Sequence, residues 1–333
     1  MRLLVLGGGG FLGYHAVAEA VAQGHDVTVL SRSGKAPVDG VEVLVGDRQG
    51  DLSALRGREW DGVFDTFNDT APGAPAIRTT ARLLSGAVGG YAYVSGMSVY
   101  APGGPAVPDE EAPVRAADVE PLTDRLQERS LAKLAGEAAV REAFDGVALF
   151  PRVGIMVGPR SSRFTYWPLR LAAARDGRLP RRVLVPGDPD RPVQFSDARD
   201  IARWSTQLLA AGLGGTFNTV GPGRAESLRA VLRACLEAVG AEPDDVELVE
   251  VAHEKLLRGQ LIDVDEEDRP LWYPEDQICQ DAVDSRRAAA AGLIFRPTRE
   301  TAADTWRWAE QAGSTEAADF VEREQGILRA WRR

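Results

Sequence analysis

The chain has 333 residues, of which 44% are hydrophobic and 26% charged, proportions that are ordinary for a soluble globular protein. This length suits a large domain together with a smaller one. The net charge of −10 disfavours binding to nucleic acid or anionic lipid, and no apolar stretch approaches the roughly 20 residues of a membrane span. The two cysteines and three histidines lack metal-site spacing, so the sequence predicts a cytoplasmic protein that has no metal site.

The amino-terminal residues predict a strand, a helix and a second strand. Residues 2–6 are a short apolar run stopped by glycines, which is typical of a buried parallel strand. Residues 12–23 place alanine and valine on one helical face, and 26–32 form the next strand. Further strands are predicted at 41–47, 60–67, 91–96, 147–153 and 215–221, and helices at 51–57, 75–88, 130–144 and 197–211. This alternation predicts an α/β fold with a doubly wound, mostly parallel Rossmann-type sheet.

A glycine-rich turn, GGGGFLG, joins the first strand to the first helix at residues 7–13. Glycine permits the tight turn, a close approach of the backbone to a pyrophosphate, and close packing of the helix on the strand. The N-terminus of the helix then offers free N–H groups to phosphate. The turn therefore predicts dinucleotide binding, with these candidate contacts: Gly7, Gly10, Phe11, Leu12 and Gly13.

The end of the second strand indicates which dinucleotide is preferred. An acidic residue at this point would bind the ribose 2′-OH of NAD, but the chain has Ser31 and Arg32. A guanidinium and a hydroxyl suit a 2′-phosphate, so NADP(H) is predicted over NAD(H). The remaining candidate contacts lie at the ends of the third and fourth predicted strands: Asp47, Arg48, Thr66 and Asn68.

Two segments interrupt the alternation. Residues 101–121 contain five prolines, and 158–192 contain eight arginines in a chain that is acidic overall. From residue 222 onward, helices mix with short strands. The predicted division has a dinucleotide-binding Rossmann domain at 1–157 plus 193–221 and a smaller α+β substrate-binding domain at 158–192 plus 222–333.

Several motifs resemble the short-chain dehydrogenase/reductase superfamily, and most closely its extended branch, the NAD-dependent epimerase/dehydratase family. They are GGGGFLG (7–13), YVSGMSVY (93–100), RSLAKLAGE (129–137), LFPRVGIMVGP (149–159) and RPVQFSDARDIA (191–202). The resemblance implies a small-molecule substrate and a catalytic Tyr-x-x-x-Lys helix, whose lysine bonds the nicotinamide ribose. Homodimers are common among such proteins.

The chain departs from this resemblance at the residues that handle protons. Lys133 matches the lysine of the motif, but the tyrosine position holds Arg129, and the position of the usual Ser or Thr holds Gly96. The guanidinium of arginine stays charged near neutral pH, so it cannot donate a proton, although it can stabilise an oxyanion or bind phosphate. Lys133, Arg129 and Ser98 are the predicted catalytic residues, with Ser98 as a replacement hydroxyl. The other replacements considered are Ser95, Tyr100, Tyr166, Asn68 and Asp69.

The arginine-rich segment predicts where a substrate binds. Arg191 matches the position at which the resemblance implies binding of a nucleotide-sugar diphosphate, which indicates a small anionic metabolite; the alternative is that the arginines form a solvated face. The aromatic run FTYW (164–167) offers Tyr166 as a wall of an apolar pocket, which would suit a skeleton from secondary metabolism.

Three functions stay open at this point. The first is an NADP(H)-dependent oxidoreductase or epimerase-like enzyme with a non-standard proton donor. The second is a non-redox cyclase, isomerase or lyase in which Arg129 binds an anionic intermediate. The third is an NADP-sensing regulatory protein without catalysis. An RNA-binding relative of the superfamily is disfavoured by the acidic charge.

Overall fold

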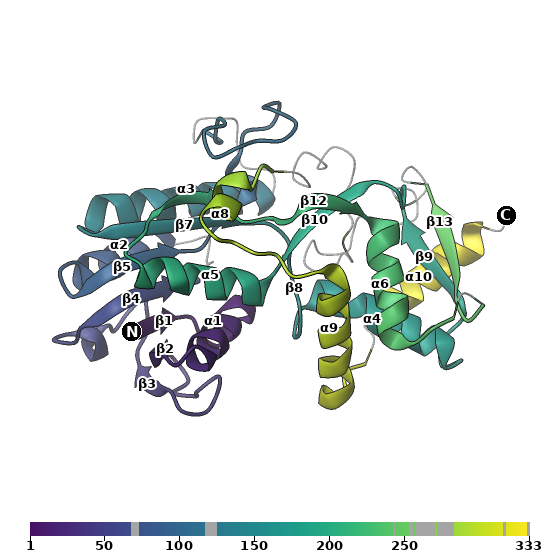
Figure 1. The fold of residues 1–333 in the computed structure, drawn as a ribbon, viewed down its shortest axis with the longest axis horizontal. Helices are drawn as coiled ribbons and strands as arrows, with labels where there is room; N and C mark the ends of the chain where they lie inside the picture. The colour runs from purple at the N-terminus through teal and green to yellow at the C-terminus, as the bar shows by residue number, and fades with distance from the viewer. Residues whose placement is uncertain are drawn as a thin grey trace. The chain divides into compact units, whose positions relative to one another are not determined.

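A computed structural model describes most of the chain. The described residues are 1–67, 73–116, 125–242, 244–252, 256, 271, 283–315 and 318–331. They form two compact units, each described here by itself (Figure 1). Unit 1 comprises Met1–Gly154, Ala198–Gly223 and Val283–Ile294; unit 2 comprises Ile155–Asp197, Arg224–Ala282 and Phe295–Arg333.

A parallel sheet forms the centre of unit 1. In chain order its strands are β1 (Arg2–Leu6), β2 (Asp26–Ser31), β3 (Glu42–Val45), β4 (Trp60–Asp65), β5 (Val88–Tyr93), β6 (Ser95–Gly96), β7 (Val147–Val153) and β11 (Gly215–Asn218). The spatial order is β11-β7-β5-β4-β1-β2-β3, with β6 beside β7, and each of these pairings is parallel. The predicted doubly wound, mostly parallel sheet is confirmed.

The register of the sheet brings the candidate residues to one edge. Leu6 pairs with Leu30 on β2 and with Asp65 on β4, and Asp65 pairs with Tyr93 on β5. The residues that follow β1, β2 and β4 therefore meet at the carboxyl edge. The strand order reverses between β1 and β4, which is where open α/β sheets bind ligands.

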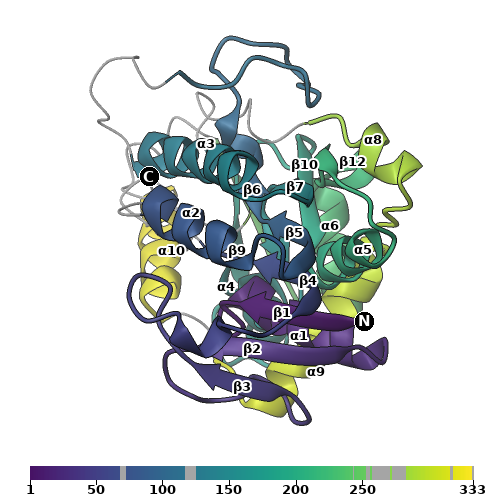
Figure 2. The same ribbon diagram turned by 90° about the vertical axis from the view of Figure 1, so that its left-hand side faces the viewer.

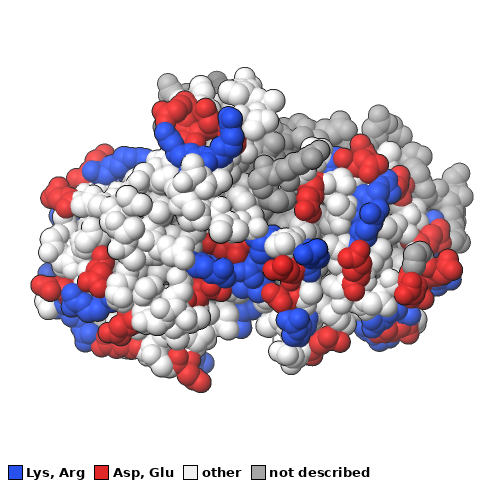
Figure 3. Space-filling view, viewed as in Figure 1, with Lys and Arg blue, Asp and Glu red and all other residues white. Residues whose placement is uncertain are grey.

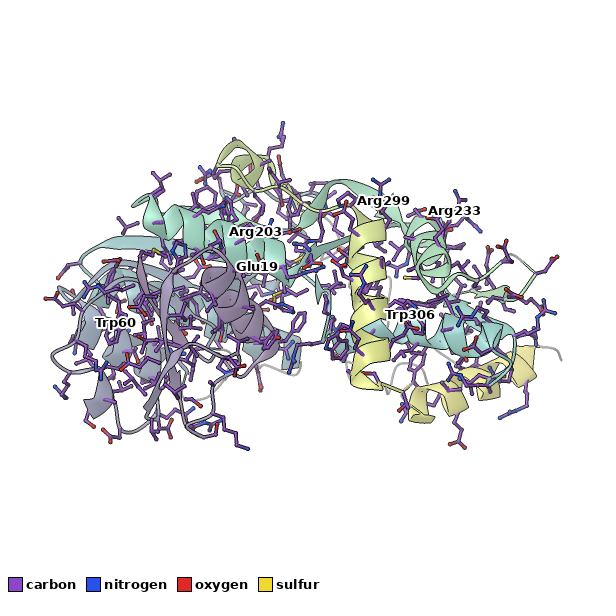
Figure 4. All side chains as sticks on the ribbon, turned by 60° about the horizontal axis from the view of Figure 1, so that its bottom comes forward. Glu19, Trp60, Arg203, Arg233, Arg299 and Trp306 are labelled. Carbon is purple, nitrogen blue, oxygen red and sulfur yellow. The ribbon has the colours of Figure 1, made fainter. Side chains whose placement is uncertain are left out.

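Helices cover both faces of this sheet. On one face α1 (Phe11–Ala22) packs on α5 (Ala198–Ala210), and Arg203 Nε donates to Glu19 Oε2 at 3.0 Å between them (Figure 4). On the other face α2 (Gly73–Leu84) packs on α3 (Arg125–Ala143) (Figure 2). Two 3-10 turns, η1 (Ser53–Leu55) and η2 (Met97–Val99), and the short α8 (Arg286–Ala290) complete unit 1.

Unit 2 is a smaller mixture of helices and strands. Its helices are α4 (Ser162–Arg175), α6 (Leu228–Val239), α9 (Thr298–Ala312) and α10 (Ala318–Trp331). β9 (Arg182–Pro186) pairs with β13 (Glu247–Val251), and β10 (Pro192–Asp197) lies between β8 (Met156–Val157) and β12 (Gly221–Ser227). The core of the unit contains side chains such as Phe164, Trp167, Phe195 and Leu232.

The compact units differ from the predicted boundaries most at two places, apart from shifts of two or three residues at 155–157 and 222–223. Residues 193–197 fall in unit 2, because β10 pairs with β8. Residues 283–294 fall in unit 1, where the Ser285 hydroxyl donates to the Val220 carbonyl at 2.7 Å and Trp204 Nε1 donates to the Ala291 carbonyl at 3.0 Å. Within the described ranges, every helix is too short or too polar to cross a membrane.

Candidate functional site

The glycine turn between β1 and α1 has the geometry that a dinucleotide needs. Gly7 has φ +93°, which side chains rarely adopt, and Gly10 N–H donates to its carbonyl at 3.2 Å. A Cβ on Gly13 would lie 2.1 Å from the Gly7 carbonyl oxygen, and a Cβ on Gly8 would lie 2.8 Å from Val29. Gly7, Gly8 and Gly13 therefore permit the turn itself and its close packing on α1 and β2.

The other two glycines leave space above the start of α1. A Cβ on Gly9 would meet nothing within 4 Å, and one on Gly10 would meet only the Gly7 carbonyl, at 3.7 Å. Gly10 caps the 12-residue helix without a side-chain hydrogen bond, so the first N–H groups, at Phe11 and Leu12, depend on another acceptor. The turn thus fits the pyrophosphate of a dinucleotide: glycines stand where side chains would fill the open space, beside the positive end of a helix.

The end of β2 presents a hydroxyl and a guanidinium. Ser31 is half-buried and its Oγ lies 3.1 Å from Ser33 Oγ, while Arg32 is exposed. Within the described part of the chain, no residue forms a hydrogen bond or an ion pair with the Arg32 side chain. This arrangement is compatible with binding of a 2′-phosphate by Arg32.

Asp47 and Arg48, in the turn after β3, have structural partners. Asp47 Oδ1 accepts from the Gln49 N–H at 3.0 Å, which makes Asp47 a turn residue. Arg48, a candidate cofactor contact, has an acidic partner within the protein. Its side chain is 10% exposed, and it forms a bidentate ion pair with Asp65, Nη1 to Oδ1 at 2.5 Å and Nη2 to Oδ2 at 2.6 Å. The guanidinium is committed to this buried carboxylate because a buried charge is costly without a partner.

Thr66, directly after β4, supports the glycine turn. Its hydroxyl donates to the Leu6 carbonyl at 3.0 Å and lies 3.4 Å from the Gly7 carbonyl oxygen. A Cβ on Gly7 would lie 2.4 Å from this hydroxyl oxygen, so the two residues fit each other tightly. Asn68 and Asp69, both considered as replacement proton donors, are outside the described residues.

Lys133 lies buried on α3, and its amine donates to two backbone carbonyls. Nζ is 2.8 Å from the oxygen of Phe67 and 2.8 Å from that of Val94. Burial is the main cause that lowers the pKa of Lys133 to about 7; the positive charge of Arg129 lowers it further, against the opposing charge of Asp65. Arg129, one helical turn earlier, is half-buried and close enough to influence this amine. The helix thus brings together the two residues that the motif predicted on one face.

Ser98 lies beside the position where the family motif has its hydroxyl. A Cβ on Gly96 would lie 3.6 Å from Ser98 Oγ, so this hydroxyl occupies the space next to the missing side chain. Ser98 is half-buried in η2, and its carbonyl accepts from Arg115 Nε at 2.9 Å. Ser95 is fully buried. Of these two serines, Ser98 is therefore the better candidate for contact with a substrate.

A buried polar network that sequence reasoning missed supports α3. Glu137 forms a bidentate pair with Arg152 on β7, with both N–O distances 3.0 Å, and Arg152 Nη1 also donates to the Tyr100 hydroxyl at 3.2 Å. Tyr100 in turn donates to Asn218 Oδ1 at 2.6 Å. Burial alone would raise the pKa of Glu137, but Arg152 outweighs it and holds the pKa below its usual range. The spacing of Glu137, one turn after Lys133, was the only sequence signal for this network.

Tyr166, predicted to wall a substrate pocket, has a packing role in the structure. It lies in the core of unit 2 beside Trp167, and its hydroxyl is 3.4 Å from Glu324 Oε1. Burial, followed by the negative charge of Glu324, raises the pKa of Tyr166 well above its usual range, which also excludes it as an easy proton donor. The aromatic run fills the core because α4 is buried along most of its length.

Many arginines of the arginine-rich segment have partners inside unit 2. Arg170 pairs with Glu324 at 2.7 Å with both side chains fully buried, and Arg182 lies 3.4 Å from Glu247. Arg191 Nη2 donates to the Leu271 carbonyl at 2.6 Å. The local excess of arginine is thus largely explained by the packing of this unit. A role for Arg191 in binding substrate stays a prediction.

Comparisons with known proteins give the fold of this chain. No family model and no curated protein matches the sequence. Three matching solved structures have TM-scores of 0.61 to 0.63. MoeE5 in complex with UDP-glucose and NAD is 20% identical, and the match covers 94% of this chain and 100% of that one. UDP-glucose 4-epimerase from Bifidobacterium longum in complex with NAD+ and UDP is 17% identical, covering 94% and 99%. UDP-N-acetylglucosamine 4-epimerase from Bacillus cereus is 17% identical, covering 92% and 98%. The chain has the fold of these proteins along almost all of its described length.

Proposed function

We propose that this chain is an NADP(H)-binding oxidoreductase or epimerase-like enzyme of the extended short-chain dehydrogenase/reductase type, acting on a small anionic metabolite. The observation that carries the proposal is the glycine turn, which is closely packed at Gly7, Gly8 and Gly13 and open at Gly9 and Gly10. Solved structures of the same fold hold NAD with UDP-glucose or UDP, which supports a nicotinamide dinucleotide and an anionic substrate.

The preference for NADP(H) rests on the end of β2. The exposed Arg32 would bind the 2′-phosphate, and Ser31 would add a hydroxyl. On the face shown in Figure 3, Lys and Arg side chains are interspersed with Asp and Glu, and the net charge is −10. This charge distribution favours a small phosphorylated ligand over nucleic acid.

The proposed chemistry differs from the usual arrangement in its proton handling. When bound, the nicotinamide supplies hydride transfer. Arg129 would stabilise negative charge that develops on a substrate oxygen, and the Ser98 hydroxyl would hold or pass the proton. Lys133 would bind the nicotinamide ribose through an N–H of its amine. A charged amine has three N–H groups, and the Phe67 and Val94 carbonyls accept two of them.

Gly9→Ala tests the proposal directly. A Cβ at residue 9 would touch nothing in the protein, so the variant should keep the free energy of unfolding of the wild type within about 0.5 kcal/mol. If a pyrophosphate lies against this backbone, the same methyl group should weaken NADPH binding at least about tenfold, as measured by calorimetry. Binding of neither NADPH nor NADH by the wild type would refute the proposal.

Turnover separates the three possible functions. The purified protein is incubated with NADPH and a panel of nucleotide sugars and other anionic carbonyl compounds, with absorbance and products followed together. Oxidation of NADPH, or epimerised product formed only with the dinucleotide, supports the enzyme proposed here. Product formed without any dinucleotide would favour the non-redox function of Arg129, whereas binding without product would favour a regulatory protein.

A further inference from the structure

Asp65, the last residue of β4, lies at the centre of a buried cluster that the proposed function does not use. Its side chain is fully buried, and four donors reach its two carboxylate oxygens. They are Arg48 Nη1 at 2.5 Å, Arg48 Nη2 at 2.6 Å, the Tyr91 hydroxyl at 2.5 Å and the Phe67 N–H at 2.8 Å. A carboxylate with this many donors is acceptor-saturated, so it holds its neighbours in place and is not available to a ligand.

The residues that follow Asp65 connect it to two parts of the cofactor site. The Thr66 hydroxyl bonds the Leu6 carbonyl beneath the glycine turn, and a Cβ on Gly7 would collide with it. The Phe67 carbonyl accepts from Lys133 Nζ at 2.8 Å. Three successive residues, 65–67, therefore link the phosphate-binding turn to the lysine of α3.

The same cluster holds the turn that follows β3. Arg48 forms the bidentate pair with Asp65, and its guanidinium also stacks on the Phe67 ring, 4.3 Å from the centroid. Asp47, a candidate cofactor contact, directly precedes Arg48 in the chain. The position of Asp47 is consequently tied to Asp65 through one residue.

We propose that Asp65 is a positioning residue of the dinucleotide site, which fixes the glycine turn, the turn after β3 and the Lys133 amine relative to one another. The inference rests on the proposed function and adds to it a residue that touches no ligand. It predicts that loosening the cluster lowers the fraction of folded molecules in the binding-competent arrangement, which weakens affinity. Loss of global stability alone would leave affinity unchanged as long as the protein stays folded.

Conservative variants measure this effect without removing the buried charge. Tyr91→Phe deletes one donor to Asp65 and keeps the ion pair, and Thr66→Val deletes the hydroxyl that supports the glycine turn. Thr28→Val is the matched control, since it deletes a buried hydroxyl of the same sheet that accepts from Trp60 Nε1 at 3.1 Å. We expect NADPH affinity to fall about three- to tenfold in Tyr91→Phe and in Thr66→Val, and less than about twofold in Thr28→Val.

A second readout follows the Lys133 amine itself. The chain has only three lysines, Lys35, Lys133 and Lys255, so ¹³C labelling of lysine gives three resolvable side-chain signals. The charged or titratable groups around this amine are Asp65 on β4, Arg48 after β3, Arg129 and Glu137 on α3, and Tyr93 on β5. Asp65→Asn removes the nearest stabilising negative charge, so the titration midpoint of Lys133 should move to lower pH.

The outcomes distinguish the inference from the proposed function. If wild-type protein binds no dinucleotide, the proposed function fails, whatever the variants do. If the wild type binds NADPH and the affinities of Tyr91→Phe, Thr66→Val and Thr28→Val are equal, the positioning role of Asp65 is refuted. An unchanged Lys133 midpoint in a folded Asp65→Asn variant refutes it as well. If Asp65→Asn does not fold, the affinities of the two conservative variants decide alone.

Discussion

The amine of Lys133 lies 2.8 Å from the carbonyl oxygen of Phe67, at the carboxyl end of the parallel sheet. The Val94 carbonyl accepts from the same amine at the same distance. A neutral amine has two N–H groups, so it satisfies both carbonyls without a charge. The surroundings of Lys133 therefore tolerate the neutral form, in line with the low pKa, about 7, that burial gives this side chain.

This arrangement predicts a specific pH dependence of stability. The pKa of Lys133 is about 7 in the folded protein and about 10.4 in the unfolded chain, so between these values the unfolded state binds more protons. The free energy of unfolding should therefore gain about 2–3 kcal/mol from this residue between pH 6 and pH 9. Lys133→Met removes that gain. Urea unfolding of both proteins at the two pH values measures it, and parallel pH profiles would contradict the lowered pKa of the buried Lys133 amine.

Glu137→Gln should be among the most destabilising single changes on α3. Glu137 and Arg152 are 2% and 6% exposed, and the change leaves a buried guanidinium without its counter-charge. We expect a loss of about 3–5 kcal/mol in the free energy of unfolding. Glu142→Gln on the same helix breaks the Arg78–Glu142 pair, whose side chains are 39% and 60% exposed, and should cost less than about 1 kcal/mol. Similar losses in the two variants would rule out a structural role for the buried pair.

The sequence predicted the sheet well because its signals are local. Apolar runs bounded by glycine gave the strands, and the spacing in the turn at 7–13 gave the start of α1 to within one residue. Local signals were weaker around the third strand. Its predicted range, 41–47, is longer than the observed strand, Glu42–Val45, and the helix predicted at 51–57 is the 3-10 turn Ser53–Leu55. β3 is the last strand at one edge of the sheet, so it pairs with a neighbouring strand on one side only.

Two of the predicted site residues, Arg48 and Tyr166, have partners that are distant in the chain. Arg48 pairs with Asp65, an acidic residue inside an apolar run, and only the pairing of β4 with β5 brings Tyr91 to the same carboxylate. Tyr166 meets Glu324, 158 residues later, so the aromatic run alone could not distinguish a core from a pocket wall. Single-sequence periodicity carries no information on such long-range pairs.

Arg32→Ala should change the choice of dinucleotide without affecting the fold. Arg32 is exposed at the end of β2, so its removal should leave stability unchanged within about 0.5 kcal/mol. The loss of charge-assisted bonds to a 2′-phosphate should weaken NADPH binding about 10- to 150-fold and leave NADH binding within about twofold. Arg58→Ala, which removes another exposed arginine, should alter neither affinity. Equal weakening of NADPH binding and NADH binding would show that residue 32 does not contact the 2′-phosphate.

Arg129→Tyr tests whether the arginine on α3 faces the amine of Lys133. The positive charge of Arg129 helps to keep the pKa of Lys133 low, so a neutral side chain should move the titration midpoint of Lys133 to higher pH. Arg129→Lys keeps the charge and should leave the midpoint close to that of the wild type. The measurement is a ¹³C titration of labelled lysine, with NADPH oxidation by carbonyl compounds followed in parallel. A midpoint that stays unmoved in Arg129→Tyr would place the guanidinium away from the amine. The chemistry proposed for Arg129 beside Lys133 would then lack its basis.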